Sequence, residues 1–398
     1  MNWYRYPFSN DGRIERAHEK NTVELLTAVH GNFGNLAFQY PLEVMLSFPP
    51  QPWPGFDFFQ SNANDSGLMI SAANWLTTKG EGQITEELIA AMESARTAVI
   101  FGLGAQAPFD TKPHDFTAAL SAAQGDRIHR ISELVPTIAV RDNFTARVLA
   151  EMDIQNVQIL GCPSFLIAKD GWLGSAIGKK CEKVLLKDQS NVRVTVNEFT
   201  PNPYSRHLTR KGLVDTLDFV LRFHAHYVLQ GRHCLAAYHG ESEDMDQSFD
   251  AILTNNELVN LRRVLQRHSF VFNNVPDWIA YYQSRDLVVG TRIHGAILAL
   301  QAGTPAVLLA HDSRTCGLAE VLGIPSFRVD RRPLSSMDLH ELVTFVRKCC
   351  MRLNGERMRL AGQWMNFFQQ HHVRLSGHLS KIANSSKREY PPQKPKYL

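Results

Sequence analysis

Residues 284–330, SRDLVVGTRIHGAILALQAGTPAVLLAHDSRTCGLAEVLGIPSFRVD, decide the fold class of this chain. Residues 287–289 are a short β-branched run typical of a buried strand, and residues 296–302 are typical of a helix closed by Gly303 and Pro305. A second strand at 306–310 runs into a polar loop that opens another helix. This alternation predicts a parallel sheet, with both polar loops at the rim formed by the carboxyl ends of its strands, where ligands bind.

The side chains of these two loops suit an anionic ligand. A helix N-terminus presents unpaired N–H groups, and an arginine adds a planar fork that fits a carboxylate or a phosphate. A histidine beside it can give or take a proton near neutral pH. The alternative, in which Arg292 pairs with a nearby acid and His294 caps the helix, stays open. The predicted anion-binding residues are Gly290, Thr291, Arg292, His294, Gly295, Asp312, Ser313, Arg314 and Thr315.

The composition excludes several function classes. The net charge of +3 over 398 residues is too small for a dedicated nucleic-acid binder. The six cysteines show no C-x-x-C spacing, which favours reduced thiols over a disulfide frame or a zinc site, and no metal ligands are predicted. No apolar run reaches the roughly 20 residues that span a bilayer, and the N-terminus lacks a signal-peptide core. We therefore expect a cytoplasmic protein, at most peripheral at the inner face of a membrane.

The first half of the chain alternates strands with helices. Strands are predicted at 67–71, 98–101, 137–140 and 157–160, and the intervening helices include 84–96, with Thr85 as its cap, and 144–152. The spacing is that of βαβ units, so this half is predicted to be a doubly wound parallel layer. Residues 1–20 are expected to be frayed, 46–65 irregular, and 169–190 a polar, lysine-rich join.

The second half predicts another layer of the same kind. Strands are expected at 192–196 and 233–238, and helices at 212–229 and 256–266, before the segment quoted above. The fold class is therefore α/β, with two Rossmann-like doubly wound domains facing a cleft. The predicted domains are residues 1–188, residues 189–345, and residues 346–398, the last made of C-terminal helices and a disordered basic tail.

Several motifs together carry a resemblance to a known family. The most specific are GTRIHGAILALQAGTPAV at 290–307 and HDSRTCGLAEVLGIP at 311–325. The sequence resembles the polysaccharide pyruvyl transferase family over roughly residues 31–330. The supporting motifs, in family order, are GNFGN at 31–35, FGLGAQ at 101–106, AVRDNFTARVLAEMDIQNV at 139–157 and GCPS at 161–164.

The resemblance implies a two-domain fold like that of the GT-B glycosyltransferases. It implies transfer of a pyruvyl unit from phosphoenolpyruvate to two hydroxyls of one sugar in a polysaccharide or its precursor, which forms a ketal and releases phosphate. Phosphoenolpyruvate is then a co-substrate, no cofactor is needed, and the acceptor is a sugar, including a lipid-linked oligosaccharide. The first domain becomes the acceptor side and the second the donor side, with Arg292 and His294 at the donor site.

The sequence departs from the family pattern at three places. Asn35 stands where many members have aspartate, residues 71–74 replace a glycine-rich run, and Cys162 replaces an aspartate before proline. The family's V-R-D motif falls on residues 140–142, which makes Arg141 and Asp142 second-rank candidates. An ion pair at a strand end is the alternative for these two residues, as an ordinary turn is for residues 31–38.

On this resemblance, His294 is predicted to protonate the methylene carbon of the donor and Arg292 to clamp one of its anionic groups. The predicted sugar-binding residues are Asn32, Asn35, Asn74 and Gln106. Two other functions stay open on the same scaffold. One is a GT-B glycosyltransferase that uses a nucleotide sugar, and the other is a non-catalytic sugar-binding protein.

Overall fold

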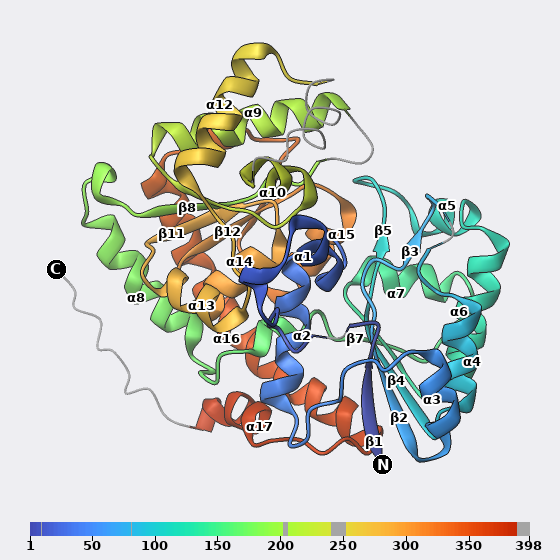
Figure 1. Ribbon diagram of the computed structural model, residues 1–398. Helices are drawn as coiled ribbons and strands as arrows, with labels where there is room; N and C mark the ends of the chain where they lie inside the picture. Colours follow the sequence, from blue (N-terminus) through green and yellow to red (C-terminus); the bar gives the residue numbers. More distant parts are fainter. Residues whose placement is uncertain (9, 81, 202–205, 240–251, 388–398) are drawn as a thin grey trace.

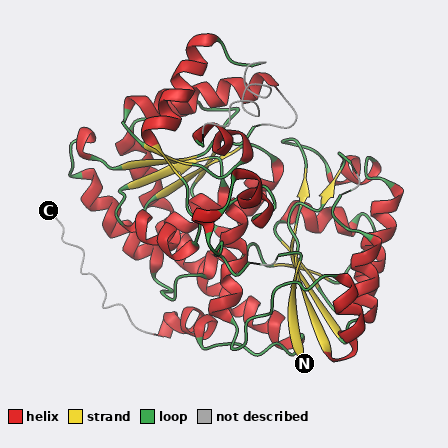
Figure 2. Ribbon diagram, viewed as in Figure 1, coloured by secondary structure: helices red, strands yellow, loops and turns green. Residues whose placement is uncertain are grey.

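The chain, described here from a computed structural model over residues 1–8, 10–80, 82–201, 206–239 and 252–387, is built around two parallel sheets (Figure 1). Every strand pair in both sheets is parallel, and helices cover the sheets (Figure 2). The predicted α/β class with two doubly wound layers is therefore confirmed. The first sheet has the order β1 (Asn2–Tyr6), β2 (Ser66–Ser71), β4 (Thr97–Leu103), β6 (Ile138–Val140), β7 (Val157–Ile159). The second has the order β10 (Ser269–Phe270), β9 (His226–Val228), β8 (Val194–Asn197), β11 (Leu287–Gly290), β12 (Ala306–Ala310), β13 (Ser326–Arg328).

Local sequence signals set the helices around the first sheet. Thr85 caps α4 by accepting a hydrogen bond from the N–H of Leu88, as predicted, and Asp142 caps α7 through Thr145. A small two-stranded sheet of β3 (Leu76–Thr77) and β5 (Ala105–Gln106) extends the carboxyl-end rim. The helices of this part are α3 (Phe56–Asn62), α4 (Glu86–Ser94), α5 (Pro113–Ala118), α6 (Ala122–Leu134) and α7 (Asn143–Ala150).

The helices around the second sheet include one that is buried on all sides. Every residue of α14 (Ile293–Gln301) is buried, which fits a sequence that is apolar on all sides apart from His294 and Gln301 at its ends. The helix α2 packs against α14, although its sequence lies in the first half of the chain. The remaining α-helices that the structure describes are α1 (Thr22–Ala28), α2 (Gly34–Met45), α8 (Leu173–Leu185), α9 (Arg206–Arg222), α10 (Arg232–Tyr238), α12 (Asn255–His268), α13 (Val275–Gln283), α15 (Ser313–Leu322), α16 (Leu339–Gln370) and α17 (His378–Ala383).

Three segments differ from their prediction because of non-local packing. The expected frayed N-terminus contains β1, which pairs with β2 at the edge of the first sheet. The expected irregular segment 46–65 contains α3, which buries Phe59. The expected polar join 169–190 contains α8, in which the buried Leu173, Ile177 and Cys181 recur at helical spacing and which packs against α16.

Two predictions in the second half are wrong in type. The segment predicted as a strand at 233–238 lies in helix α10. The helix predicted at 212–229 ends at Arg222, and the strand β9 follows within the same range. Both errors come from short apolar runs, which periodicity alone does not assign to helix or strand.

The boundary between the sheets falls between β7 and β8, near the predicted join at residues 188 and 189. The three domain ranges stay a prediction. The polar residues 240–244 after α10 and the basic tail 388–398 lie outside the described residues. Among the described helices, none has both the length and the apolar character needed to cross a membrane.

Candidate functional site

The strand β11 delivers Arg292 and His294 to the rim through a tightly packed turn. A Cβ at Gly290 would lie 2.5 Å from the carbonyl oxygen of Asn197, and one at Gly295 would lie 2.3 Å from the Asn197 side chain. Only glycine fits at these two places, because any Cβ would overlap the end of β8. The hydroxyl of Thr291 donates to the carbonyl of Glu198 at 3.2 Å, which holds the turn against β8.

Arg292 occupies the residue before α14, and its side chain, 17% exposed, points toward Glu198. Its Nη2 lies 3.8 Å from Oε1 of Glu198, beyond hydrogen-bond distance, and its Nε is buried with no hydrogen-bond partner. Oε2 of Glu198 accepts hydrogen bonds from the N–H groups of Gln230 and Gly231, at 2.5 and 2.6 Å. The alternative in which Arg292 pairs with a nearby acid therefore holds only in part. Glu198 lies near Arg292 but too far away for a hydrogen bond, so N–H donors of Arg292 stay available to a ligand.

His294 lies in the first turn of α14 and is 6% exposed. Its ring stacks on Phe38, with centroids 6.1 Å apart and an interplanar angle of 25°. Its Nε2 lies 3.7 Å from Sγ of Cys162. Burial, and then the positive charges of Arg141 and Arg314, hold the pKa of His294 well below its usual value. His294 therefore carries no charge at neutral pH in the free protein.

The second loop is mainly a helix cap. Oδ1 of Asp312 accepts from the N–H and the hydroxyl of Thr315, at 2.8 and 2.7 Å, and the Thr315 hydroxyl accepts in return from the N–H of Asp312. Burial raises the pKa of Asp312, but the charges of Arg314 and His311 and the bonds from Thr315 outweigh it and bring the pKa to about 2. Asp312 and Thr315 thus have an evident structural role, and Arg314 keeps a buried Nε without a hydrogen-bond partner.

This loop also joins the two halves of the chain. Oδ2 of Asp312 accepts a hydrogen bond of 3.1 Å from Nε2 of Gln106, on β5. The hydroxyl of Ser313 donates to the carbonyl of Ala107 at 2.9 Å. The carboxyl-end rims of the two sheets therefore touch directly at this place, and the predicted residues from both halves lie in one cluster.

Arg141, at the end of β6, is fully within this cluster. Its Nη1 donates to Oδ1 of Asn74 at 3.3 Å, and its guanidinium lies over the ring of Phe38, 4.7 Å from the centroid. Its Nε and Nη2 are buried with no hydrogen-bond partner, and burial lowers its pKa to about 10. Arg141 and Asp142 contact different groups. Arg141 contacts Asn74 and Phe38, whereas Asp142 caps α7 and packs against Gly317 of α15.

The candidate turn at residues 31–38 approaches His294 closely. A Cβ at Gly34 would lie 3.0 Å from Nδ1 of His294 and 3.3 Å from Oε1 of Gln230. Asn32 accepts a hydrogen bond from the N–H of Gly34 at 2.9 Å, and Asn35 donates to the carbonyl of Val29 at 2.9 Å. These two asparagines therefore hold the turn together, and their binding of sugar stays a prediction.

The sequence analysis missed several residues of this cluster. Glu198 follows β8 directly, so the general rule that ligands bind at the carboxyl ends of parallel strands could have found it. The buried Gln230 follows β9, which was not recognised as a strand. Phe38 has no local signal, whereas His311 follows β12 directly and begins the motif at 311–325. His311 is buried, and burial lowers its pKa to about 4.

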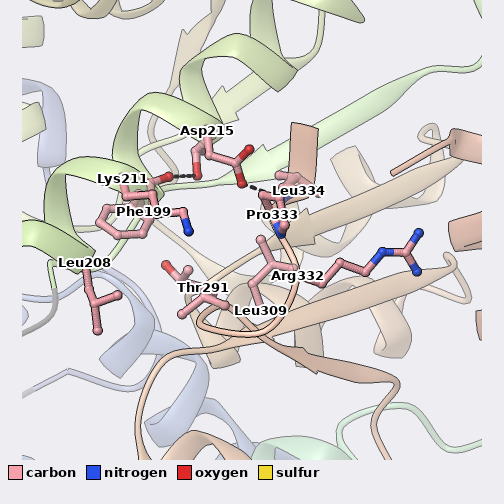
Figure 3. A pocket seen from close by; sticks show the side chains of 12 residues that line it. Phe199, Leu208, Lys211, Asp215, Thr291, Leu309, Arg332, Pro333 and Leu334 are labelled. Carbon is pink, nitrogen blue, oxygen red and sulfur yellow. Dashed lines mark hydrogen bonds between the residues drawn. The ribbon is translucent and has the colours of Figure 1, made fainter. Parts of the chain in front are cut away.

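A separate small pocket lies at the carboxyl ends of β8 and β12, against α9 (Figure 3). Phe199 and Thr291 line it, whereas Arg292 and His294 do not. Lys211 extends along it, and Asp215 accepts hydrogen bonds from the N–H groups of Leu334 and Ser335. Among the described residues, no group of three or more His, Cys, Asp or Glu side chains is arranged to hold a metal ion.

Comparisons with known proteins identify the family of this chain. Similar solved structures include trehalose-6-phosphate synthase OtsA, at 12% identity and a TM-score of 0.43 over 81% of this chain and 78% of that one. Another is the UDP-forming trehalose-phosphate synthase of Burkholderia vietnamiensis, at 11% identity and 0.42 over 95% and 80%. These weak likenesses carry no inference about activity. The sequence model described as Polysaccharide pyruvyl transferase matches residues 75–313, more than half of the chain, so the chain belongs to the polysaccharide pyruvyl transferase family.

Proposed function

We propose that this protein transfers the pyruvyl group of phosphoenolpyruvate to two hydroxyls of one sugar, forming a ketal and releasing phosphate. The observation that supports this most is the set of buried arginine N–H groups without partners around His294, contributed by Arg141, Arg314 and, on the neighbouring turn, Arg292. A buried donor left unsatisfied costs about 1–3 kcal/mol, and an anionic ligand supplies the missing acceptors.

The charge of the donor matches the cluster. Phosphoenolpyruvate carries a carboxylate and a phosphate, and an arginine binds either group through paired N–H donors. In the proposal Arg292 holds one anionic end, and Arg314 holds the other. Arg141, which comes from the first half of the chain, faces the ring of His294. Donor binding would therefore engage both halves of the chain at once.

The reaction balances with two proton transfers. The methylene carbon gains a proton and becomes the methyl group, a sugar hydroxyl oxygen bonds to the adjacent carbon, and the bond from that carbon to the phosphate oxygen breaks. The second hydroxyl closes the ketal. One hydroxyl proton ends on the methyl group and the other on phosphate. His294 is the proposed proton donor to the methylene carbon, a role worth about 10²–10⁴ in rate.

The acceptor is proposed to bind on the side of the first half. Asn32, Asn74 and Gln106 are partly exposed at the rim, where amide groups can meet sugar hydroxyls. A lipid-linked oligosaccharide and a finished polymer both offer the neighbouring hydroxyls that the ketal needs.

The test incubates the purified full-length protein with phosphoenolpyruvate and a panel of sugars and sugar polymers. Phosphate release together with a mass gain of one pyruvyl ketal on one acceptor is the expected result. Parallel reactions contain a radiolabelled nucleotide sugar in place of phosphoenolpyruvate. Transfer from the nucleotide sugar alone would replace the proposal with a glycosyltransferase. Sugar binding that survives the loss of both Arg292 and His294, without any turnover, would indicate a binding protein.

A further inference from the structure

The thiol of Cys162 is held beside His294 by the loop that follows β7. Its Sγ lies 3.7 Å from Nε2 of His294 and 2.9 Å from the hydroxyl of Ser164, and both contacts are buried. Gly161 before it has a left-handed φ of +70°, and a Cβ there would lie 2.5 Å from Cδ2 of Leu322. The position of the thiol is therefore fixed by packing.

The long helix α16 fixes the same loop from its other side. The indole N–H of Trp364 donates to the carbonyl of Leu160 at 3.0 Å. The guanidinium of Arg357 donates to the carbonyls of Phe165 and Ala168. Because these hydrogen bonds hold the loop on both sides of Cys162, the loop has little freedom to place another group beside Nε2 of His294.

The groups that face the His294 ring leave it without a negative partner. Arg141, at the end of β6, and Arg314, in α15, both bring positive charge, while Phe38 and Gly34 of α2 bring none. Burial raises the pKa of the Cys162 thiol, so the thiol is uncharged at neutral pH as well. A carboxylate in its place would stabilise a charged imidazolium.

We propose that His294, with only the uncharged thiol of Cys162 at its Nε2, stays uncharged until the anionic donor binds, so that donor binding draws a proton onto His294. The inference rests on the proposed function and makes Cys162 a positioning residue that acts through His294. The donor's negative charges offset Arg141 and Arg314, and an opposite charge within about 4–6 Å raises the pKa of a histidine by about 1–3 units. The general acid is thus charged only when there is a methylene group to protonate.

The test measures proton uptake on donor binding by titration calorimetry in buffers that differ in ionisation enthalpy. Phosphoenolpyruvate is titrated into the full-length protein, without acceptor, at about pH 7.5, where the phosphate with its second pKa of about 6 is already mainly a dianion. The wild type is expected to take up a substantial fraction of one proton per donor bound, and His294→Gln is expected to take up almost none.

Two substitutions at one position isolate the charge. Cys162→Asp places a carboxylate beside Nε2, so its His294 is charged beforehand and proton uptake is lost. Cys162→Asn has nearly the same shape without the charge and keeps the wild-type uptake. Cys181→Ser, a buried cysteine on α8 away from this site, is a further control. Equal uptake in the Asp and Asn variants, with circular dichroism confirming that both fold, would overturn the role of Cys162.

A second readout needs no donor. Histidine-labelled protein is titrated by NMR, and His294 is identified among the 16 histidines by its absence in His294→Gln. In Cys162→Asp the His294 signal should titrate at higher pH than in Cys162→Asn, and an unchanged titration would contradict the inference. If phosphoenolpyruvate produces no heat with the wild type, the proposed function is contradicted instead. A failure of the proposed function can therefore be told apart from a failure of the inference about Cys162.

Discussion

Gly231 faces the guanidinium of Arg292 so closely that a Cβ on Gly231 would lie 2.4 Å from Nη2. The same glycine donates its N–H to Glu198, whose other oxygen lies 3.8 Å from that guanidinium. The start of α10 therefore works with the end of β8 to set the direction of Arg292, although neither segment belongs to the motifs that carried the family resemblance.

The first prediction follows from this close approach. Gly231→Ala should move the Arg292 guanidinium and weaken donor binding, because a charge-assisted hydrogen bond is worth about 1.5–3 kcal/mol. The Michaelis constant for phosphoenolpyruvate should rise about ten- to a hundredfold, with a smaller change in kcat. Steady-state kinetics at varied donor concentration measure this.

A matched control is available in α16. Gly355 has nothing within 4 Å of where a Cβ would stand, so Gly355→Ala should leave the kinetics unchanged. It should stabilise the fold by about 0.5–1 kcal/mol, since alanine favours a helix interior over glycine. If Gly231→Ala shows the kinetics of Gly355→Ala, the close approach has no part in donor binding.

The second prediction concerns Arg292 itself. Arg292→Ala should raise the Michaelis constant for the donor, and Arg292→Lys should restore binding only in part, because a lysine ammonium lacks the planar fork of a guanidinium. Titration with phosphoenolpyruvate separates binding from turnover. Full rescue by lysine would mean that Arg292 contributes only its charge.

The third prediction concerns proton transfer. His294→Ala should lower kcat by about 10²–10⁴, the usual contribution of general acid–base catalysis. Donor affinity should change much less than kcat, in contrast to the Arg292 variants. Rapid-quench measurement of the methyl product checks the chemical step directly, and near-normal turnover would remove His294 from the proposed mechanism.

Local patterns predicted the part of the site that lies within one motif. The strand β11, the position of Arg292 and His294 at its carboxyl end, and the start of α15 after a polar loop all follow from residues close together in sequence. Contacts that join distant segments left no such pattern. Cys162 and His294 are separated by 132 positions, and Gln106 and Asp312 by 206. The thiol was noticed only as a departure from the family, and its contact with the imidazole required the structure.

The same reason explains the errors in the fold. The strand β1 is stabilised by pairing with β2, 64 residues further along the chain, so no local pattern in β1 indicates that it is ordered. The helix α8 has an apolar stripe, but the many lysines between its apolar residues made the segment resemble a loop. In both cases burial against a distant partner decided the structure.

The fourth prediction concerns Asp142, whose Oδ2 is buried with no hydrogen-bond partner. Burial is the largest influence on this carboxyl and raises its pKa to about 6, despite the bonds from Thr145 and the charges of Arg314 and Arg141. A carboxyl with a raised pKa binds its proton more tightly in the folded state. Its contribution to stability is therefore greatest below its unfolded pKa of about 4 and falls as the pH rises to about 6.

Asp142→Asn removes this titration and keeps an oxygen that can cap α7 through Thr145. Between about pH 4 and pH 6 the wild type should lose stability relative to the variant, by at most about 3 kcal/mol for a shift of two units, and the difference should be constant at higher pH. Urea unfolding of both proteins across this range measures the difference at each pH. Because every other titrating group is shared, a difference that stays flat from pH 4 to pH 6 would show that Asp142 ionises normally in the folded protein, and that the rim of the first sheet is more open to water than its burial indicates.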